Sequence, residues 1–348
     1  MNYKPLLTAM LLLLLPAVTF AKQRQKVLLA DPFILYHDGL YYAYGTGAPD
    51  GIEVYTSRNL RSWERRGLAL HRDDVWGDHW FWAPEVYEAN GTWYMYFTAE
   101  EHICVATADS PLGPFRQKVK KPMIEGEKCI DNTLFRDDDG RAWLFFDRFN
   151  DGLNIWVARL EDDLQTLRPE TMRPCIHVSQ RWEEVWPRVN EGSFVIKHRG
   201  RYYMTYSANS YESPMYGLGC ATASSPTGPW TKYEEDSSAS SHGSSKKSAS
   251  SPGSSKKSAS PLRSSKNPLL QRPGSLVGVG HNAMFRDRRG RLWAVYHAHR
   301  DTSHVHPRAM YMSRVRFRRV NGEWRMCISP KYKTPYMKPT AKGEDDKK

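Results

Sequence analysis

Five ionisable residues each stand at the start of a short apolar segment, which is followed by a polar turn and then an aromatic segment. They precede the glycine of that turn by roughly six to nine residues. The five are Asp31, Glu85, Asp131, Glu191 and His281. Carboxyl groups gathered at one point cannot all ionise freely, so their pKa values must separate. A deprotonated and a protonated carboxyl group are what hydrolysis of a glycosidic bond needs, because one activates water while the other protonates the leaving oxygen.

The segments that carry these residues recur along the chain and predict repeated antiparallel strands. Alternating apolar residues, closely spaced turns and many Val, Ile, Tyr and Trp residues favour strands throughout, with no convincing helix. The turn glycines are Gly39, Gly91, Gly140, Gly200 and Gly290. Once a polar stretch before the fifth repeat is set aside, the glycines are roughly fifty to sixty residues apart, which fits one four-stranded blade. We therefore expect an all-β chain folded as a five-bladed β-propeller, with the ionisable residues at one mouth of its central channel.

Segments of different composition divide the 348 residues. Residues 1–21 combine a positive charge, an apolar run and a small-residue cleavage site, which is typical of the signal peptide of an exported, periplasmic or secreted protein. The apolar run is short for a bilayer span, so we expect no stable membrane insertion. Residues 237–266 repeat Ser-Ser-Lys-Lys-Ser-Ala-Ser and predict a disordered insertion within a propeller of residues 26–336. Residues 337–348 predict a flexible charged tail.

The formal net charge of +12 would suit a polyanion, but its distribution argues against nucleic acid as a partner. About half of the excess lies in the insertion, not on predicted strands. The five cysteines are scattered without paired spacing, so we interpret them as small buried residues, with at least one free. The histidines at 297, 299, 304 and 306 lack a carboxylate or cysteine at a recognisable spacing, so zinc is not expected.

Aromatic residues lie close to the ionisable positions. Trp82 comes three residues before Glu85, and Trp186 comes five residues before Glu191. Flat rings stack on the apolar faces of sugars while polar neighbours bind their hydroxyl groups. We therefore predict that Trp82, Glu85, Trp186 and Arg308 bind substrate, and that Arg308 either contacts a sugar hydroxyl or tunes Glu191. The expected partner is an oligosaccharide or polysaccharide, and the oligomeric state stays open.

An ordered set of short motifs, one in each repeat, resembles glycoside hydrolase family 43. The motifs are Ala30-Asp31-Pro32, Trp82-Ala-Pro-Glu85, Ile130-Asp131-Asn132, Asn190-Glu191-Gly192 and Gly280-His281-Asn282. The resemblance covers nearly everything from about Val27 to Tyr336 except the insertion. It implies a five-bladed propeller from a family that includes arabinofuranosidases, β-xylosidases, arabinanases and exo-galactanases. The second motif more often ends in Asp in this family, so Glu85 departs from the pattern.

The resemblance also implies a role for each matching residue. It makes Asp31 the general base, Asp131 the residue that modulates pKa, and Glu191 the general acid of an inverting enzyme. His281 would lie on the propeller axis, where many relatives hold a water or a calcium ion. A structural calcium held through waters is therefore one expectation at His281, and no cofactor is required for the reaction.

The sequence is compatible with two classes of function. The first is a glycosidase that cleaves terminal arabinofuranosyl or xylosyl residues from plant polysaccharides or oligosaccharides by single displacement. The second is a catalytically silent propeller that binds glycans or scaffolds partners. The intact set of Asp31, Asp131 and Glu191 favours the enzyme, because a binding module has no reason to combine a base, a modulator and an acid. The sugar, its anomer and exo or endo action stay open.

Overall fold

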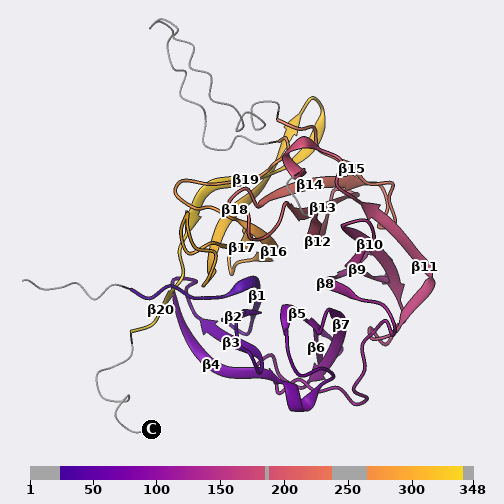
Figure 1. The fold of residues 1–348 in the computed structure, drawn as a ribbon, viewed down its shortest axis with the longest axis vertical. Coiled ribbons are helices and arrows are strands. Elements are labelled where there is room, and N and C mark those ends of the chain that lie inside the picture. Colours follow the sequence, from indigo (N-terminus) through magenta and orange to yellow (C-terminus); the bar gives the residue numbers. More distant parts are fainter. Residues whose placement is uncertain (1–23, 185–187, 237–264, 340–348) are drawn as a thin grey trace, which may run out of the picture.

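A computed structural model describes residues 24–184, 188–236 and 265–339. The described strands form five sheets around a central axis, antiparallel except for one short strand at the end of the chain, so the five-bladed β-propeller is confirmed (Figure 1). The predicted signal peptide, Trp186, nearly all of the Ser/Lys-rich insertion and most of the predicted tail lie outside the described residues.

Each blade is a meander whose first strand lies innermost, next to the axis. Blade I contains β1 (Ala30–His37), β2 (Leu40–Thr46), β3 (Gly51–Ser57) and β4 (Ser62–His71), and blade II contains β5 (Trp82–Ala89), β6 (Thr92–Ala99) and β7 (His102–Ala108). Blade III contains β8 (Cys129–Arg136), β9 (Ala142–Phe149), β10 (Leu153–Leu160) and β11 (Leu167–Ile176). Blade IV contains β12 (Asn190–His198), β13 (Arg201–Ala208), β14 (Gly217–Ala223) and β15 (Thr231–Lys232). Blade V contains β16 (Gly280–Arg286), β17 (Leu292–Ala298), β18 (Ala309–Val320) and β19 (Glu323–Lys333).

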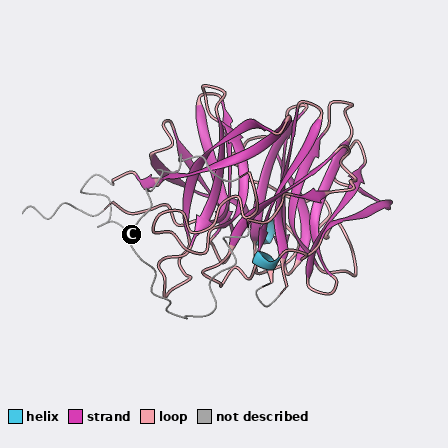
Figure 2. Cartoon of the chain, turned by 90° about the horizontal axis from the view of Figure 1, so that it is seen from above, coloured by secondary structure: helices cyan, strands magenta, loops and turns pink. Residues whose placement is uncertain are grey.

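Helical structure in the described part of the chain is limited to two single 3₁₀ turns, η1 (Arg72–Asp74) and η2 (Arg181–Glu183) (Figure 2). None of its helices is long and apolar enough to cross a bilayer. Blade II differs from the expected four strands, because the segment after β7 makes isolated bridges instead of a strand, from Arg116 to Thr107 and from Phe115 to Leu70 of blade I. That segment contains Pro111 and Pro114, which have no N–H group to donate to a ladder.

The two ends of the described chain close the ring together. A short last strand, β20 (Tyr336–Met337), pairs in parallel with β4 of blade I. The N-terminal segment lies beside it, because the N–H group of Met337 donates to the carbonyl of Gln25 at 2.8 Å. The same segment reaches blade V, where the N–H group of Met310 donates to the carbonyl of Val27 at 3.0 Å. Blades I and V are thereby tied to each other.

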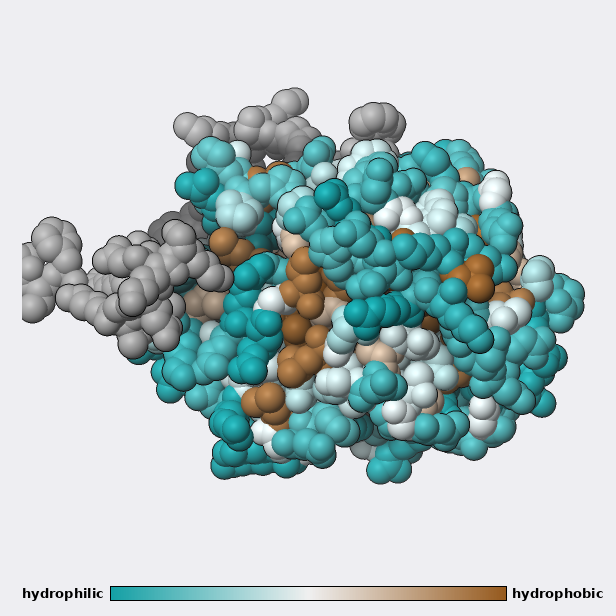
Figure 3. Space-filling view, turned by 90° about the horizontal axis from the view of Figure 1, so that it is seen from below, coloured by the Kyte–Doolittle hydropathy of each residue, from teal (hydrophilic) through white to brown (hydrophobic). Residues whose placement is uncertain are grey.

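The core lies between neighbouring blades, so many strands are buried on both faces. On β9, Leu144 packs toward blade II and the next residue, Phe145, packs toward blade IV, and both are fully buried. The outer surface is largely hydrophilic, with apolar residues in narrow strips (Figure 3). All five cysteines are free, and four of them are buried, which agrees with the interpretation of small core residues.

Every innermost strand has a β-bulge close to its start. The pairing register shifts between Ala30 and Phe33, Trp82 and Glu85, Ile130 and Thr133, Glu191 and Phe194, and Gly280 and Ala283. The first residue of each bulge has a left-handed backbone, with φ of 46° at Asp31, 46° at Ala83, 57° at Asp131, 56° at Gly192 and 48° at His281. A left-handed backbone is unfavourable for residues other than glycine, and such strain gathers at functional sites.

Candidate active site

The bulges decide which side chain of each blade reaches the mouth of the channel. Asp31, Asp131 and His281 occupy the left-handed bulge position itself. Glu191 stands one residue before that position, and Glu85 stands two residues after it, because Ala83 is the bulge residue of blade II. The expectation that all five residues converge on one spot is therefore wrong for blade II. Glu85 lies outside the cavity that the other four line.

A ring of hydrogen bonds links the bulges from blade to blade. The N–H group of each bulge residue, which a bulge frees from the strand ladder, donates to a side chain on the second strand of the preceding blade. The bonds run from Ala83 to Thr46 Oγ1 at 3.0 Å, from Asp131 to Thr98 Oγ1 at 3.2 Å, from Gly192 to Asp147 Oδ2 at 2.9 Å, from His281 to Ser207 Oγ at 2.7 Å, and from Asp31 to His297 Nδ1 at 3.1 Å. This ring fixes the backbone under each candidate catalytic group.

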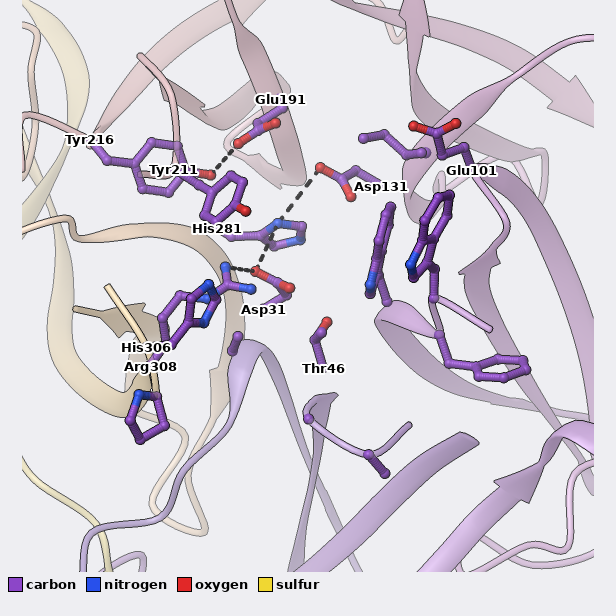
Figure 4. Close-up of a pocket in the computed structure, with 18 of the residues that line it drawn as sticks. Asp31, Thr46, Glu101, Asp131, Glu191, Tyr211, Tyr216, His281, His306 and Arg308 are labelled. Atoms are coloured by element: carbon purple, nitrogen blue, oxygen red, sulfur yellow. Dashed lines mark hydrogen bonds and ion pairs between the residues drawn. The ribbon is translucent and has the colours of Figure 1, made fainter. Parts of the chain in front are cut away.

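A cavity of about 810 Å³ opens at this end of the channel and receives side chains from all five blades. Trp80 and Trp82 stack on each other in its lining, with ring centroids 5.6 Å apart, and Trp80 is half exposed. Figure 4 shows Tyr211 and His306 on one side of the cavity and Glu101 on the other. Exposed aromatic rings beside clustered carboxyl groups form a site suited to a sugar.

Asp31 is held as a carboxylate by its neighbours. Arg308 Nη1 lies 3.1 Å from its Oδ1, and His281 Nδ1 lies 3.5 Å from the same oxygen. Burial alone would raise the pKa of Asp31, but the positive charge of Arg308, together with His281, holds it well below its usual range. Burial lowers the pKa of His297 to about 3, so His297 is neutral and free to accept the N–H group of Asp31.

Glu191 has the opposite environment. Burial, followed by the negative charge of nearby Asp131, raises its pKa to about 8, although a hydrogen bond from the Tyr216 hydroxyl to Oε1 at 2.6 Å opposes this. Glu191 therefore holds its proton at neutral pH. One cavity thus contains an ionised carboxylate on blade I and a protonated carboxyl group on blade IV.

Asp131 interacts electrostatically with both Asp31 and Glu191. His281 stands between Asp31 and Asp131, with Nδ1 3.7 Å from Asp131 Oδ2 (Figure 4). Burial raises the pKa of Asp131, and the charge of Asp31 raises it further, against the effect of His281. A buried carboxyl group at this place controls the proton of Glu191 by like-charge proximity.

The predicted substrate-binding residues are placed differently from one another. Trp82 and Arg308 line the cavity, and Arg308 pairs with Asp31 while its guanidinium lies over the Tyr211 ring, 5.0 Å from the centroid. Trp186 lies outside the described residues.

Glu85 belongs to a buried hydrogen-bond chain below the cavity. The Tyr87 hydroxyl bonds to its Oε2, its Oε1 lies 2.7 Å from Thr133 Oγ1, and Thr133 lies 2.6 Å from the Ser193 carbonyl. Thr133 has one hydroxyl proton, which the Ser193 carbonyl requires. All members are therefore satisfied when Glu85 is protonated and donates to Thr133. Burial raises the pKa of Glu85 to about 8, which agrees with this arrangement.

Replacement of Glu85 should act on stability and not on the chemistry in the cavity. Glu85→Ala removes the acceptor of the buried Tyr87 hydroxyl and one of the two hydrogen bonds of Thr133, so we expect a loss of about 2 to 4 kcal/mol in the free energy of unfolding. Glu85→Gln can donate and accept as the protonated acid does, and should cost far less. Denaturant unfolding of both variants measures the difference. Equal losses would contradict the hydrogen-bond arrangement described for Glu85.

The stability of the wild-type protein should also depend on pH through Glu85. A folded-state pKa raised to about 8 stabilises the fold fully below the usual value of 4.5, and this contribution is lost as the pH rises through about 8. Glu85→Gln should therefore gain stability relative to wild type between pH 5 and pH 8.

The donor atoms around His281 do not form a site for direct coordination of a cation. Calcium takes six to eight oxygen ligands, whereas His281 offers one nitrogen, and its Nδ1 faces Asp31 and Asp131. Within the described part of the chain, the one group of three metal-type ligands is the surface set of Asp78, His79 and Glu100. Any ion at His281 would be held through water.

Removal of divalent ions should therefore change activity little. We expect an excess of EDTA to lower kcat less than about twofold, since weakly held ions contribute little to a site that carries its own acid and base. Assay after dialysis against EDTA, with calcium added back as control, measures this. A tenfold loss restored by calcium would show that an ion is part of the site, and restoration by zinc alone would overturn the expectation of no zinc.

Sequence reasoning missed Asp147, Tyr216 and His297. Asp147 and His297 are acceptors of the ring, and the sequence does contain a signal for them. Each acceptor lies 15 or 16 positions after the bulge residue of its own blade, as with Asp131 and Asp147 or His281 and His297. Tyr216 comes from the loop before β14, and no periodic pattern marks it.

Solved structures share the fold and much of the sequence. A structure described as an endo-1,4-beta-xylanase from Bacteroides thetaiotaomicron VPI-5482 is 38% identical, with a TM-score of 0.78 over 91% of this chain and 99% of that one. A thermostable family-43 glycoside hydrolase is 32% identical, with a TM-score of 0.70 over 92% of this chain and 97% of that one.

Curated relatives are more distant. The beta-D-galactofuranosidase of Aspergillus niger is 26% identical over 58% of this chain and 63% of its own length. The extracellular exo-alpha-(1->5)-L-arabinofuranosidase of Streptomyces avermitilis is 28% identical over 62% of this chain and 49% of its own length. The chain thus spans about half to just under two thirds of these relatives. The model of the family "Glycosyl hydrolases family 43" matches residues 25–321. With this match across the propeller and its carboxyl-lined cavity, the chain belongs to glycosyl hydrolase family 43.

Proposed function

We propose that this chain is an exo-acting glycosidase that removes terminal arabinofuranosyl or xylosyl residues from plant polysaccharides or oligosaccharides with inversion. The observation that carries the proposal is the opposite protonation of two carboxyl groups in one cavity. Asp31 is a carboxylate beside Arg308. Glu191 has a pKa raised to about 8, so it keeps its proton at neutral pH. This division is what a single-displacement hydrolysis requires.

The reaction follows from these protonation states. Asp31 takes a proton from a water molecule as the water oxygen bonds to the anomeric carbon. The glycosidic carbon–oxygen bond breaks in the same step, and Glu191 gives its proton to the departing oxygen. Asp131 supplies the charge that keeps Glu191 protonated until then. Exchange with solvent afterwards returns the proton to Glu191 and removes it from Asp31.

Two features support terminal action by single displacement. All five blades contribute side chains to the cavity lining, which supports a pocket that takes the end of a glycan chain. Asp31 and Glu191 come from blades I and IV, and blade V contributes His281 between these blades in the ring order. Carboxyl groups on opposite sides of a funnel leave room for the attacking water, as inverting enzymes need.

The sugar assignment rests on relatives whose names include an exo-arabinofuranosidase, a beta-xylosidase and an endo-1,4-beta-xylanase. Polymeric plant glycans are degraded outside the cell, so the proposal includes an exported protein. The alternative is a silent propeller that binds glycans or scaffolds partners. A binding site gains nothing from holding one buried carboxyl group ionised and another protonated, which favours the enzyme.

A substrate panel tests the proposal. Nitrophenyl α-L-arabinofuranoside, β-D-xyloside and β-D-galactoside should be followed by oligomers of arabinan, arabinoxylan and galactan. We expect release of single arabinose or xylose units from chain ends. Early release of internal oligomers would show endo action instead. Saturable binding of these glycans without any hydrolysis would establish the silent propeller.

A further inference from the structure

Asp147 on β9 differs in chemistry from the other four acceptors of the hydrogen-bond ring. Thr46, Thr98 and Ser207 accept with hydroxyl groups, and His297 accepts with a neutral imidazole. All four are uncharged. A hydroxyl group is enough to accept a bulge N–H group, so the ring itself does not explain a carboxyl group in blade III.

The surroundings of Asp147 require a proton on either its own carboxyl group or that of Asp131. The side chain is fully buried, and its Oδ2 accepts the N–H group of Gly192 at 2.9 Å. Its Oδ1 is also buried, and no N–H or O–H group among the described residues donates to it. Its side chain is hydrogen-bonded to that of Asp131. Two carboxylates have no hydrogen between them, so this bond exists only if one of the two groups is protonated.

The charges around Asp147 place the proton on Asp147. Burial raises its pKa well above the usual value, and the negative charge of Asp131 on β8 raises it further. Cys175 at the end of β11 is also within electrostatic reach, but its own pKa is raised by burial, so it is a neutral thiol. Asp131 is the better carboxylate of the pair, because His281 lies 3.7 Å from its Oδ2.

We infer that Asp147 is a protonated positioning residue, which donates a hydrogen bond to Asp131 and accepts one from the backbone of Gly192, next to Glu191. It thereby connects the group that modulates the acid to the backbone that carries the acid. A neutral donor also keeps Asp131 ionised in a buried place, and the charge of Asp131 in turn keeps Glu191 protonated. This inference rests on the proposed acid role of Glu191.

Two substitutions separate the proton from the ring. Asp147→Asn can accept the N–H group of Gly192 and still donate to Asp131, so it imitates the protonated acid. Asp147→Thr keeps the ring acceptor, as Thr46 and Thr98 show in blades I and II, but its hydroxyl is attached directly to Cβ and ends one bond short of the carboxyl oxygens, so it should no longer reach Asp131. Loss of the donor makes Asp131 easier to protonate, and a neutral Asp131 no longer raises the pKa of Glu191. Thr98→Ser, which keeps a hydroxyl acceptor beside Asp131, is the matched control.

The alkaline limb of the pH profile of kcat/KM is the main measurement. We expect Asp147→Thr to move this limb to lower pH by about one unit or more and to lower kcat by about tenfold or more. Asp147→Asn should recover most of kcat, with the limb within about 0.3 units of wild type, and so should Thr98→Ser. A downward shift in Asp147→Asn would show that Asp147 acts as a negative charge and would overturn the inference. A wild-type profile in Asp147→Thr would show a structural role only.

Carbon-13 NMR of the wild-type protein labelled at the Asp carboxyl carbons tests the proton without any reaction. One Asp resonance should remain at the protonated position through pH 7 and be missing from Asp147→Asn. Its absence from wild type would overturn the inference even if Asp147→Thr fails to fold. Hydrolysis that is missing altogether from wild type would defeat the proposed function instead, and the NMR result would still stand for Asp147.

Discussion

Asp31→Ala should lower kcat/KM by roughly 10³- to 10⁴-fold on every substrate, including those with activated leaving groups. The base acts on the attacking water, so no leaving group can replace it. Asp31→Asn keeps the shape and the contact with Arg308 but cannot take a proton, and the loss should be similar. Steady-state kinetics on a nitrophenyl glycoside and on an oligosaccharide measure both variants.

Asp38→Asn is the matched control for this experiment. Asp38 lies in the turn after β1, and its side chain is 86% exposed. The same chemical change there should leave kinetics within about twofold of wild type, as is usual for surface positions. If Asp31→Asn kept more than a tenth of wild-type activity while remaining folded, Asp31 would not be the base.

Glu191→Ala should have an effect that depends on the leaving group. Oligosaccharides have poor leaving groups and need the proton of Glu191, so we expect a loss of roughly 10³-fold. Activated aryl glycosides leave without protonation and should lose about tenfold or less. A plot of log kcat/KM against the pKa of the leaving group should be steep for Glu191→Ala and shallow for wild type.

The same substitution should change the pH profile. Wild-type activity falls as the pH rises through about 8, because Glu191 must be protonated to act as an acid and its pKa is raised to about 8. In Glu191→Ala the activity on an activated glycoside should no longer fall there. Glu85→Gln is the control, since the pKa of Glu85 is also raised to about 8 but its side chain lies outside the cavity. Loss of the alkaline limb in Glu85→Gln would show that the limb comes from Glu85, and it would contradict the assignment to Glu191.

The fold and the ionisable residues of the cavity that start the innermost strands could be predicted because they repeat. Five similar segments give five blades, and a strand start is a fixed place in each of them, so Asp31, Asp131, Glu191 and His281 come together as expected. The closure of the ring by β20, which pairs with β4 of blade I, could not be predicted, because β20 has two residues and leaves no periodic signal. The short fourth strand of blade IV, β15, is hidden for the same reason.

Errors in the site come from register and from long-range contacts. Glu85 and Glu191 look like equivalent strand starts, but Glu85 precedes its turn glycine by six residues and Glu191 precedes its own by nine, so they lie three positions apart relative to the bulge. Arg308 is paired with Asp31, 277 residues away, and nothing local in the sequence encodes that partner. The hydrogen bond between Asp131 and Asp147 also depends on a bulge, because Asp131 occupies the bulge position of β8 and Asp147 lies on the neighbouring strand, β9.

The configuration of the first-formed product tests the central claim most directly. Proton NMR during hydrolysis of whichever arabinofuranoside or xyloside the panel identifies will show the anomer before mutarotation mixes the two forms. An ionised Asp31 that activates water opposite a protonated Glu191 predicts a product of inverted configuration. A first-formed product of retained configuration would contradict these roles, because it requires a carboxylate that bonds to the sugar.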